Sequence, residues 1–349
     1  MNLKGWLIIS LCLILVFLVG ALGTAGCNPS KTDVLPQENE TEGEDPVDQG
    51  MQLTLAMASP GGTWQAIAEG VAQAIRQQYP GSKVEVITGS IGGNPVSVQG
   101  KKATFALSHA PNAKLAIDGT PPYDSPNPDL MGLSSAYVGP LHFIVPADSP
   151  INSFNEIKEK QYPVKMSINS KGSTPEFLSE AIFNQYGITL EDVKSWGGEI
   201  TYLSSGEAFA LLLERVYNMG VTISYLPSTP VLELASGLEI KLLSLDDHVV
   251  DFLCQNYGTV RSVIPGGTYT FQDEDVITIG SPNIFIVHKD MPDEVAYKIV
   301  ESMDKQRDYL NNVHETFKVL TLERMYKDMG GLPVHPGALK YYQENGIVD

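Results

Sequence analysis

The stretch Gln52–Ile75, QLTLAMASPGGTWQAIAEGVAQAI, places a strand, a glycine-rich turn and a helix in direct succession. Gln52–Ala58 reads as a strand, whereas apolar residues recur at helical spacing after Thr63. Two glycines, a serine and a threonine lie between them in SPGGTW. The stretch predicts a strand–turn–helix unit of an α/β protein, and its open backbone suits a small charged ligand.

The alternation of strand and helix continues along the chain. Between the strands, apolar residues such as Phe177, Leu178 and Ala181 recur at helical spacing. Further strands are predicted at 84–87, 104–108, 132–146, 164–168, 199–204, 220–226, 240–245 and 276–289. Strands and helices that alternate in this way predict mainly parallel sheets with helices on both faces.

Two lobes are predicted, because the roughly 300 residues after Met51 exceed what one core usually takes. A new cycle of strands and helices begins near Ser149, and the last third of the chain is expected to return to the first block. We therefore expect lobe 1 to comprise residues 51–147 and 264–349, and lobe 2 to comprise residues 148–263.

The first 26 residues read as a lipoprotein-type signal peptide, with one lysine, a long apolar run and small residues before Cys27. Cys27 is the residue that would be lipidated after cleavage. The alternative is a permanent membrane anchor formed by Trp6–Leu22, and both interpretations export the remaining chain. Residues 27–50 are acidic and almost without apolar side chains, so they predict a solvated tether.

The charge balance argues against several classes of partner. The chain has 41 acidic and 23 basic residues, a formal net charge of −18, and the basic residues are scattered. Binding to nucleic acid or to anionic lipid surfaces is therefore not expected. Of the three cysteines, only Cys254 lies in the predicted folded region, so no internal disulfide can form there. We interpret Cys254 as a small core residue.

Three loops combine glycines with hydroxyl or amide side chains, and each follows a predicted strand. They are SPGGTW, TGSIGGN (Thr88–Asn94) and KGST (Lys171–Thr174). Any one of them could be an ordinary turn or helix cap. Together they favour a ligand site, because ligands of open α/β sheets bind beyond the carboxyl ends of the strands, where helix N-termini attract anions.

Signals for catalysis or metal binding are weak. The six histidines are far apart in sequence, and no paired ligand motif or nucleophile elbow is present. Asp273–Asp275 lacks the alternating oxygen ligands of a calcium loop and reads as a solvated turn. An exported hydrolase would need a nucleophile–base pair that the sequence does not suggest. We therefore expect a protein that is not an enzyme and has no cofactor or bound metal.

IPGGTYTFQDEDVITI, Ile264–Ile279, strongly resembles the motif of the TAXI family, the extracytoplasmic solute-binding subunits of TRAP transporters. GGTW, VITGSIGGN, AYVGPLHFIVPADSPINSFNEIK, MSINSKGSTPEFLSEAIFNQYGIT and LPVHPGALKYYQENG are similar to other family segments, in the same order. The resemblance covers essentially Met51–Gly346. It implies a two-lobed periplasmic-binding-protein fold of type II-like organisation, with the ligand in the cleft between the lobes.

The resemblance also implies a function. Known members bind small carboxylates such as glutamate, glutamine or 2-oxoglutarate and deliver them to the sodium-coupled TRAP membrane permease. Ligand-binding positions carried over to this chain are Gly62, Thr63, Trp64, Thr88, Ser90, Asn94, Ser108, Tyr137, Ser173, Thr174, Ser224, Tyr225 and Tyr269.

Three departures from the family pattern leave the ligand open. SHAPN, with His109, stands where the family has Gln or Ser followed by Asp, and PVSVQGKKA replaces a Leu-rich helix. The register of the Lys171–Pro175 loop against the family motif is uncertain by one residue. Two alternatives to the carboxylate receptor are therefore kept: a receptor for phosphate or another oxyanion, and a ligand-sensing ectodomain that does not transport.

Overall fold

Two β-sheets organise residues 50–58 and 63–349, which are the residues that the computed structural model describes. The larger sheet has eight strands; its main order is β2-β1-β3-β10-β4-β7, with β8 beside β4 and β9 beside β10. The strands are β1 (Gln52–Ala56), β2 (Lys83–Ile87), β3 (Phe105–His109), β4 (Leu130–Pro146), β5 (Lys165–Ser167), β6 (Glu199–Thr201), β7 (Gly220–Ile223), β8 (Ile240–Leu242), β9 (Val260–Ile264) and β10 (Val276–His288). β5 and β6 form the second sheet.

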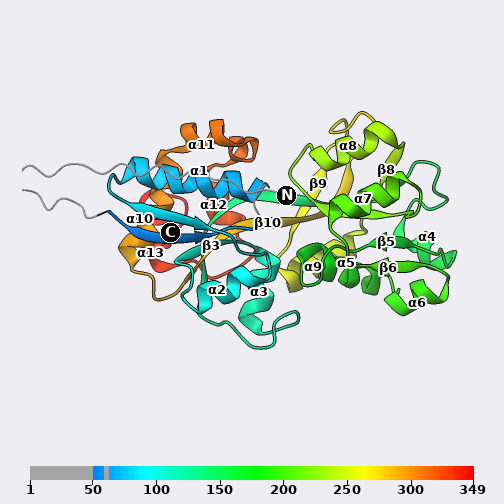
Figure 1. Ribbon diagram of the computed structural model, residues 1–349, viewed down its shortest axis with the longest axis horizontal. Coiled ribbons are helices and arrows are strands. Elements are labelled where there is room, and N and C mark those ends of the chain that lie inside the picture. The colour runs from blue at the N-terminus through cyan, green and yellow to red at the C-terminus, as the bar shows by residue number, and fades with distance from the viewer. Residues whose placement is uncertain (1–49, 59–62) are drawn as a thin grey trace, which may run out of the picture. The chain divides into compact units, whose positions relative to one another are not determined.

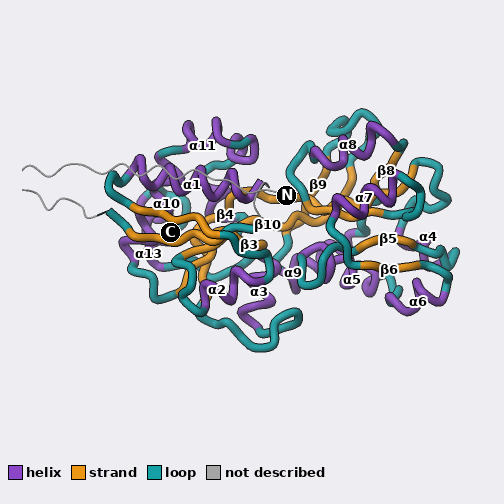
Figure 2. Tube along the Cα trace, viewed as in Figure 1, coloured by secondary structure: helices purple, strands orange, loops and turns teal. Residues whose placement is uncertain are grey.

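Helices connect most of these strands, as Figures 1 and 2 show. They are α1 (Thr63–Gln78), α2 (Gly93–Gln99), α3 (Ala110–Asp118), α4 (Phe154–Glu159), α5 (Thr174–Gln185), α6 (Leu190–Ser195), α7 (Ser205–Leu213), α8 (Thr229–Gly237), α9 (Asp247–Tyr257), α10 (Asp293–Lys305), α11 (Arg307–Val313), the 3-10 helix η1 (Glu315–Val319), α12 (Leu322–Lys327) and α13 (Pro336–Glu344). None of them is long and apolar enough to cross a membrane. The predicted signal peptide, Cys27 and the acidic tether lie outside the described residues.

The α/β class is confirmed, and the opening unit forms as the sequence predicts. β1 pairs in parallel with β2 and with β3, and α1 follows β1 with Trp64, Ile67 and Val71 on its buried face. In Figure 1, α1 lies on one side of these strands and α2 and α3 lie on the other. PVSVQ, which departs from the family pattern, is nevertheless helical within α2.

The expectation of mainly parallel sheets is wrong in detail, because the larger sheet is mixed. β10 is antiparallel to β3, β4 and β9, and β4 is antiparallel to β7 and β8. The sequence-based prediction assumed that every strand follows a helical crossover. Instead β10, near the end of the chain, inserts between β3 and β4 in the opposite direction.

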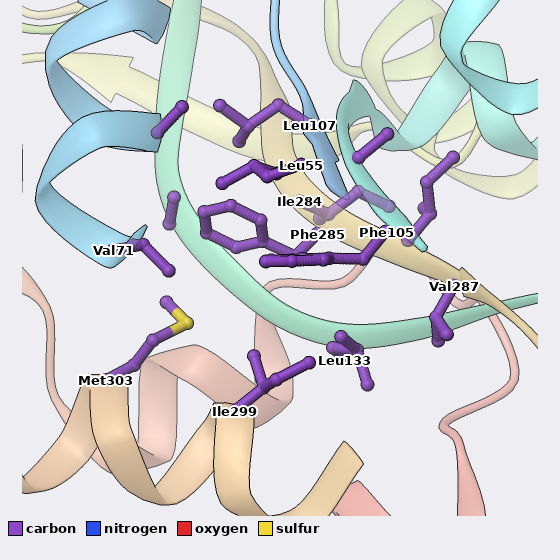
Figure 3. Packing of buried hydrophobic residues seen from close by; sticks show 14 of the residues in the cluster. Leu55, Val71, Phe105, Leu107, Leu133, Ile284, Phe285, Val287, Ile299 and Met303 are labelled. Atoms are coloured by element: carbon purple, nitrogen blue, oxygen red, sulfur yellow. The ribbon is translucent and has the colours of Figure 1, made fainter. Parts of the chain in front are cut away.

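Buried apolar residues form three clusters. The first cluster combines residues from β1, α1, β3 and the start of β4 with residues from β10, α10 and the C-terminal segments. Figure 3 shows its centre, where Phe105 and Phe285 lie beside Leu55, with Val71 of α1 and Met303 of α10 to one side. The second cluster gathers around Phe143, and the third gathers around Ile144 and Tyr269.

The two longest strands connect the clusters. β4 has 17 residues and contributes Leu133 to the first cluster and Phe143 to the second. β10 has 13 residues and contributes Phe285 to the first cluster and Ile279 to the second. Because β4 and β10 pair with each other, a two-stranded bridge runs from one core into the next.

Candidate functional site

Two of the three candidate loops line one cavity of about 790 Å³, here named the loop cavity. Ser90–Gly93, after β2, forms one wall, and Asn169–Ser173, after β5, forms the opposite wall. The segment Pro122–Ser125 completes the lining, together with Ala58, Val96 and Asn127. The predicted ligand residues Ser90 and Ser173, which are 83 positions apart in sequence, therefore face the same space.

Ser173 is the buried hydroxyl of this cavity. It precedes the first turn of α5, its residue is 8% exposed, and its side chain makes no capping hydrogen bond. Its Oγ is inaccessible to solvent and has no hydrogen-bond partner among the described residues. Buried hydroxyls normally have a partner, so Ser173 is an exception among the residues that line this cavity.

The two walls approach each other through glycines. A Cβ on Gly92 would lie 3.3 Å from the carbonyl oxygen of Gly172, closer than most side-chain contacts. Gly172 has a φ of +75°, a backbone conformation that residues with a Cβ rarely adopt. Its nitrogen donates to Glu176 Oε2 at 3.1 Å, which fixes the turn. Glycine at both positions therefore permits the close approach of the loops.

Asn94 holds the first wall rather than reaching into the cavity. Its Nδ2 donates to the carbonyl oxygens of Met57 at 3.0 Å and Leu107 at 2.6 Å, and its Oδ1 accepts from the nitrogen of Ser90 at 3.1 Å. The residue is 1% exposed. Its amide thus fastens the ends of β1 and β3 to the loop, which is a positioning role.

Trp64 joins the start of α1 to the centre of the large sheet. Its Nε1 donates to Asn283 Oδ1 at 2.8 Å, and its ring meets His109 edge-on, with 5.2 Å between the ring centroids. Burial lowers the pKa of His109 to about 4, and the Asn283 side chain, which would accept a hydrogen bond from the protonated ring, opposes that shift. His109 is therefore neutral near pH 7. Gly62, beside this turn, lies outside the described residues.

Thr174 connects the second wall to the end of β3. Its Oγ1 lies 2.5 Å from His109 Nδ1 and donates a hydrogen bond to Asn112 Oδ1. Asn112 Nδ2 in turn donates to the carbonyl oxygen of Gly172 at 3.2 Å and lies 3.5 Å from the Tyr123 hydroxyl. Thr174 is fully buried, so its hydroxyl serves these contacts rather than the loop cavity.

Tyr137 and Tyr225 line a different cavity, of about 420 Å³, with side chains of β9, η1 and α12. The Tyr225 ring meets His314 edge-on at 5.3 Å, and burial raises the pKa of Tyr137. Ser224, next to Tyr225, donates its backbone nitrogen to the carbonyl oxygen of Pro140 at 3.2 Å. Two of the three predicted tyrosines, Tyr137 and Tyr225, thus line one cavity, but not the one that Ser90 and Ser173 line.

The remaining predicted residues have varied surroundings. Tyr269 is a core residue of the third cluster, 1% exposed, whose hydroxyl contacts His142 and accepts from the Ser228 nitrogen. It does not line the loop cavity. Ser108 is fully buried and donates to the carbonyl oxygen of His109. Thr88 is exposed, and Thr63 is half-buried at the first position of α1.

Sequence reasoning missed Asn112 and Asn283 and treated His109 only as a departure from a pattern. Each makes side-chain contacts with residues distant in sequence, and no local motif marks such contacts. Cys254 is half-buried, and burial raises the pKa of its thiol, which disfavours a nucleophilic thiolate. Within residues 50–58 and 63–349, no group of three or more potential ligands could hold a metal ion.

The arrangement described above, an α/β structure in which strands of two sheets end in glycine-rich loops around a cavity, is the fold of periplasmic binding proteins. MatC from Rhodopseudomonas palustris, solved with bound malate, matches with a TM-score of 0.51 and 11% identity over 86% of this chain and 99% of that one. PhnD1 from Prochlorococcus marinus, solved with methylphosphonate, matches with a TM-score of 0.50 and 11% identity over 85% and 99%.

The chain belongs to the NMT1-like family, whose model matches residues 55–346. The match begins in β1 and ends just after α13, so it includes both walls of the loop cavity. The prediction of a binding protein rather than an enzyme agrees with this family and fold. The family match is coarser than the TAXI resemblance and does not name a ligand.

Proposed function

We propose that this chain is the extracytoplasmic solute-binding receptor of a TRAP transporter of the TAXI type. In this proposal it binds a small organic carboxylate, such as glutamate, glutamine or 2-oxoglutarate, in the loop cavity. It then delivers the ligand to the membrane permease. The ligand would be held by backbone N–H groups and hydroxyls of the two glycine-rich walls.

One observation carries the proposal: Ser90 and Ser173, expected from sequence to contact one ligand, line one cavity, and Ser173 Oγ has no partner among the described residues. An unsatisfied buried hydroxyl costs about 1–3 kcal/mol, and a ligand oxygen would remove that cost. The site therefore gains from a hydrogen-bonding ligand at the position where the sequence predicts one.

The charges around the cavity suit a small anion held mainly by neutral donors. Lys171 and Asp124 are the charged residues in the cavity lining, and both are exposed. Their charges offset each other, whereas the whole chain has a formal net charge of −18. A carboxylate would thus meet less repulsion here than over most of the surface. The malate bound to MatC, a protein of similar fold, supports the same ligand class.

We propose that the protein closes on its ligand as two lobes, residues 51–147 with 264–349 and residues 148–263. The first cluster draws on the former segments, and most of the second and third clusters comes from the latter. β4 and β10 would then act as the hinge, because they run through the first two clusters. A ligand that binds the closed form better than the open form shifts the equilibrium toward closure.

Export and lipidation at Cys27 belong to the same proposal, because a receptor must meet its solute outside the membrane. The support is the signal-peptide layout and the TAGC sequence before residue 28. The mass of the mature N-terminal peptide tests it. An intact precursor that keeps residues 1–26 would instead show that Trp6–Leu22 is a permanent anchor.

A phosphate or phosphonate receptor is the second candidate, and a sensor ectodomain with the same ligand is a third. The glycine-rich walls suit any small oxyanion, and PhnD1, which has a similar fold, was solved with methylphosphonate. Ligand screening separates the two anion classes. A sensor would bind the same ligand as the receptor but would not support its uptake by a TRAP permease.

The test is a thermal-shift panel of glutamate, glutamine, 2-oxoglutarate, malate, phosphate and methylphosphonate, followed by calorimetric titration of the best compound. A ligand at a hundred times its dissociation constant stabilises the protein by about 2.7 kcal/mol. Ser173→Ala should weaken binding at least tenfold without loss of stability, because its hydroxyl has no partner to lose. Ser179→Ala removes another unpartnered buried hydroxyl of α5, outside the cavity lining, and is the matched control. Equal affinity of both variants would exclude the loop cavity as the site.

A further inference from the structure

The contacts of Asn112 fix the direction of a buried hydrogen-bond chain. The carbonyl oxygen of Gly172 can only accept, so Asn112 must present Nδ2 to it and therefore Oδ1 to Thr174. Thr174 must then donate its single hydroxyl proton to Asn112. Its Oγ1 lies 2.5 Å from His109 Nδ1, so that nitrogen must be the donor. His109 is thus a neutral imidazole protonated on Nδ1.

His109 also contacts the first turn of α1. Its ring lies edge-on to Trp64, which donates to Asn283, and Asn283 is the cross-strand neighbour of His109 in the β3–β10 pair. One imidazole therefore touches the helix that follows the first glycine-rich loop and the helix that follows the third. The residues concerned are buried, since His109 is 6% exposed and Asn112 and Thr174 are fully covered.

We propose that His109 is a positioning residue for solute binding: its Nδ1–H, through Thr174 and Asn112, sets the Ser173 wall of the loop cavity against the wall fastened to β1 and β3. The inference rests on the proposed function, and it adds the residue that makes the two walls one unit. Ser173 and Gly172 adjoin the threonine that receives the bond, so a shift at Thr174 moves the cavity wall directly.

The geometry separates this role from simple core packing. Gly172 is held by Asn112 at its carbonyl oxygen and by Glu176 at its nitrogen, in a left-handed conformation with a φ of +75°. Loss of the His109 donor would leave Thr174 without a fixed orientation and free the Asn112 amide to turn. The Lys171–Ser173 segment would then sample other positions, and binding would require its ordering again.

The first experiment needs no ligand. Nitrogen-15 NMR of the histidine-labelled full-length protein should show His109 with Nδ1 protonated and Nε2 bare. Amide hydrogen exchange of residues 170–178 should accelerate in His109→Phe and in Thr174→Val. It should stay as in wild type in His142→Phe, because His142 contacts Tyr269 and Pro140 instead. The inference would be overturned if His109 Nδ1 carries no proton, or if amide hydrogen exchange is unchanged in both His109→Phe and Thr174→Val.

The second experiment titrates L-glutamate, 2-oxoglutarate and inorganic phosphate separately into the folded variants. Thr174→Val and His109→Phe should weaken whichever compound binds at least tenfold. Thr174→Ser and His109→Gln, which restore a hydroxyl and an N–H donor, should stay within about threefold of wild type, as should Ser179→Ala. Equal affinity of Thr174→Val and Thr174→Ser would contradict the positioning role. If the wild-type protein binds none of these compounds, the result counts against the proposed ligand classes. The hydrogen-exchange data would still show whether His109 positions the Ser173 wall.

Discussion

His109 and His142 are both buried histidines, yet their protons are fixed by different kinds of partner. His142 Nδ1 lies 3.0 Å from the carbonyl oxygen of Pro140, two residues away on the same strand, so its proton is held within β4. His109 Nδ1 lies 2.5 Å from the hydroxyl of Thr174, at the start of α5. A backbone carbonyl of its own strand cannot move away from His142, whereas Thr174 can move away from His109.

The difference distinguishes a core histidine from one that depends on conformation. Because Pro140 fixes His142 as the Nδ1–H tautomer, its Nε2 accepts from the Tyr269 hydroxyl at 2.8 Å, and that hydroxyl accepts from the Ser228 nitrogen at 3.0 Å. This chain stays within the region of the third cluster. The chain through His109 joins β3 and α3 to α5, so it exists only while those elements touch.

The largest expected effect is a loss of stability on acidification. Burial lowers the pKa of both histidines from 6.5 to about 4. Between these two pH values the histidines are protonated in the unfolded chain but neutral in the folded chain. Their contribution is fully present above pH 6.5 and is lost as the pH falls from 6.5 through 4. Each histidine should account for about 3 kcal/mol, from 1.36 kcal/mol per pKa unit.

Denaturant unfolding between pH 4 and pH 7 measures this effect in wild type, His109→Gln and His142→Gln. Each substitution should remove about half of the histidine-dependent slope. If His142→Gln reduces the pH dependence of the unfolding free energy but His109→Gln leaves it unchanged, His109 is not a buried neutral group. The two histidines would then not be comparable.

A smaller effect should follow Tyr269→Phe, which removes the hydroxyl that His142 and the Ser228 nitrogen share. Two buried polar groups lose a partner, so the free energy of unfolding should fall by about 2 kcal/mol. Tyr225→Phe is the control, because its hydroxyl makes only a 3.5 Å contact with Thr229. Equal stability of the two variants would show that the tyrosine at 269 contributes by packing alone.

The smallest effect is expected from Trp64→Phe, which leaves Asn283 Oδ1 without the indole donor. The cost should be about 1 kcal/mol, the net value of one hydrogen bond. The histidine NMR signals sharpen the test, since the ring signals of His109 should shift while those of His142 should not. Shifts at both rings would mean that the substitution disturbs the sheet as a whole, and shifts at neither would break the link between Trp64 and His109.

Local patterns were enough to predict β1, α1 and the loops that line the cavity. The apolar stripe of α1, the glycines of Ile91–Gly93 and the strand before Ser173 are all encoded within about ten residues. These signals depend on backbone preferences, which neighbouring residues decide. Ser90 and Ser173 could therefore be placed at strand ends. Their meeting at one cavity could not be predicted from these patterns, because β2 and β5 belong to different sheets.

Long-range pairing could not be predicted in the same way. The bond between Trp64 and Asn283 spans 219 positions, and that between Thr174 and Asn112 spans 62. The antiparallel insertion of β10 between β3 and β4 likewise depends on which edge the returning chain meets. Tyr269, expected at the ligand, lies in the third cluster because its ring stacks on Phe271 and its hydroxyl is already satisfied.

The composition of the first cluster affects how the protein can be made. Leu55 and Val71 are synthesised early, but the same cluster includes Phe285, Met303 and Tyr342, which are synthesised in the last fifth of the chain. A core begun near residue 51 therefore cannot close until synthesis is almost complete. The export proposed above would fit this order of synthesis, because a translocation channel takes a chain whose first core has not yet closed.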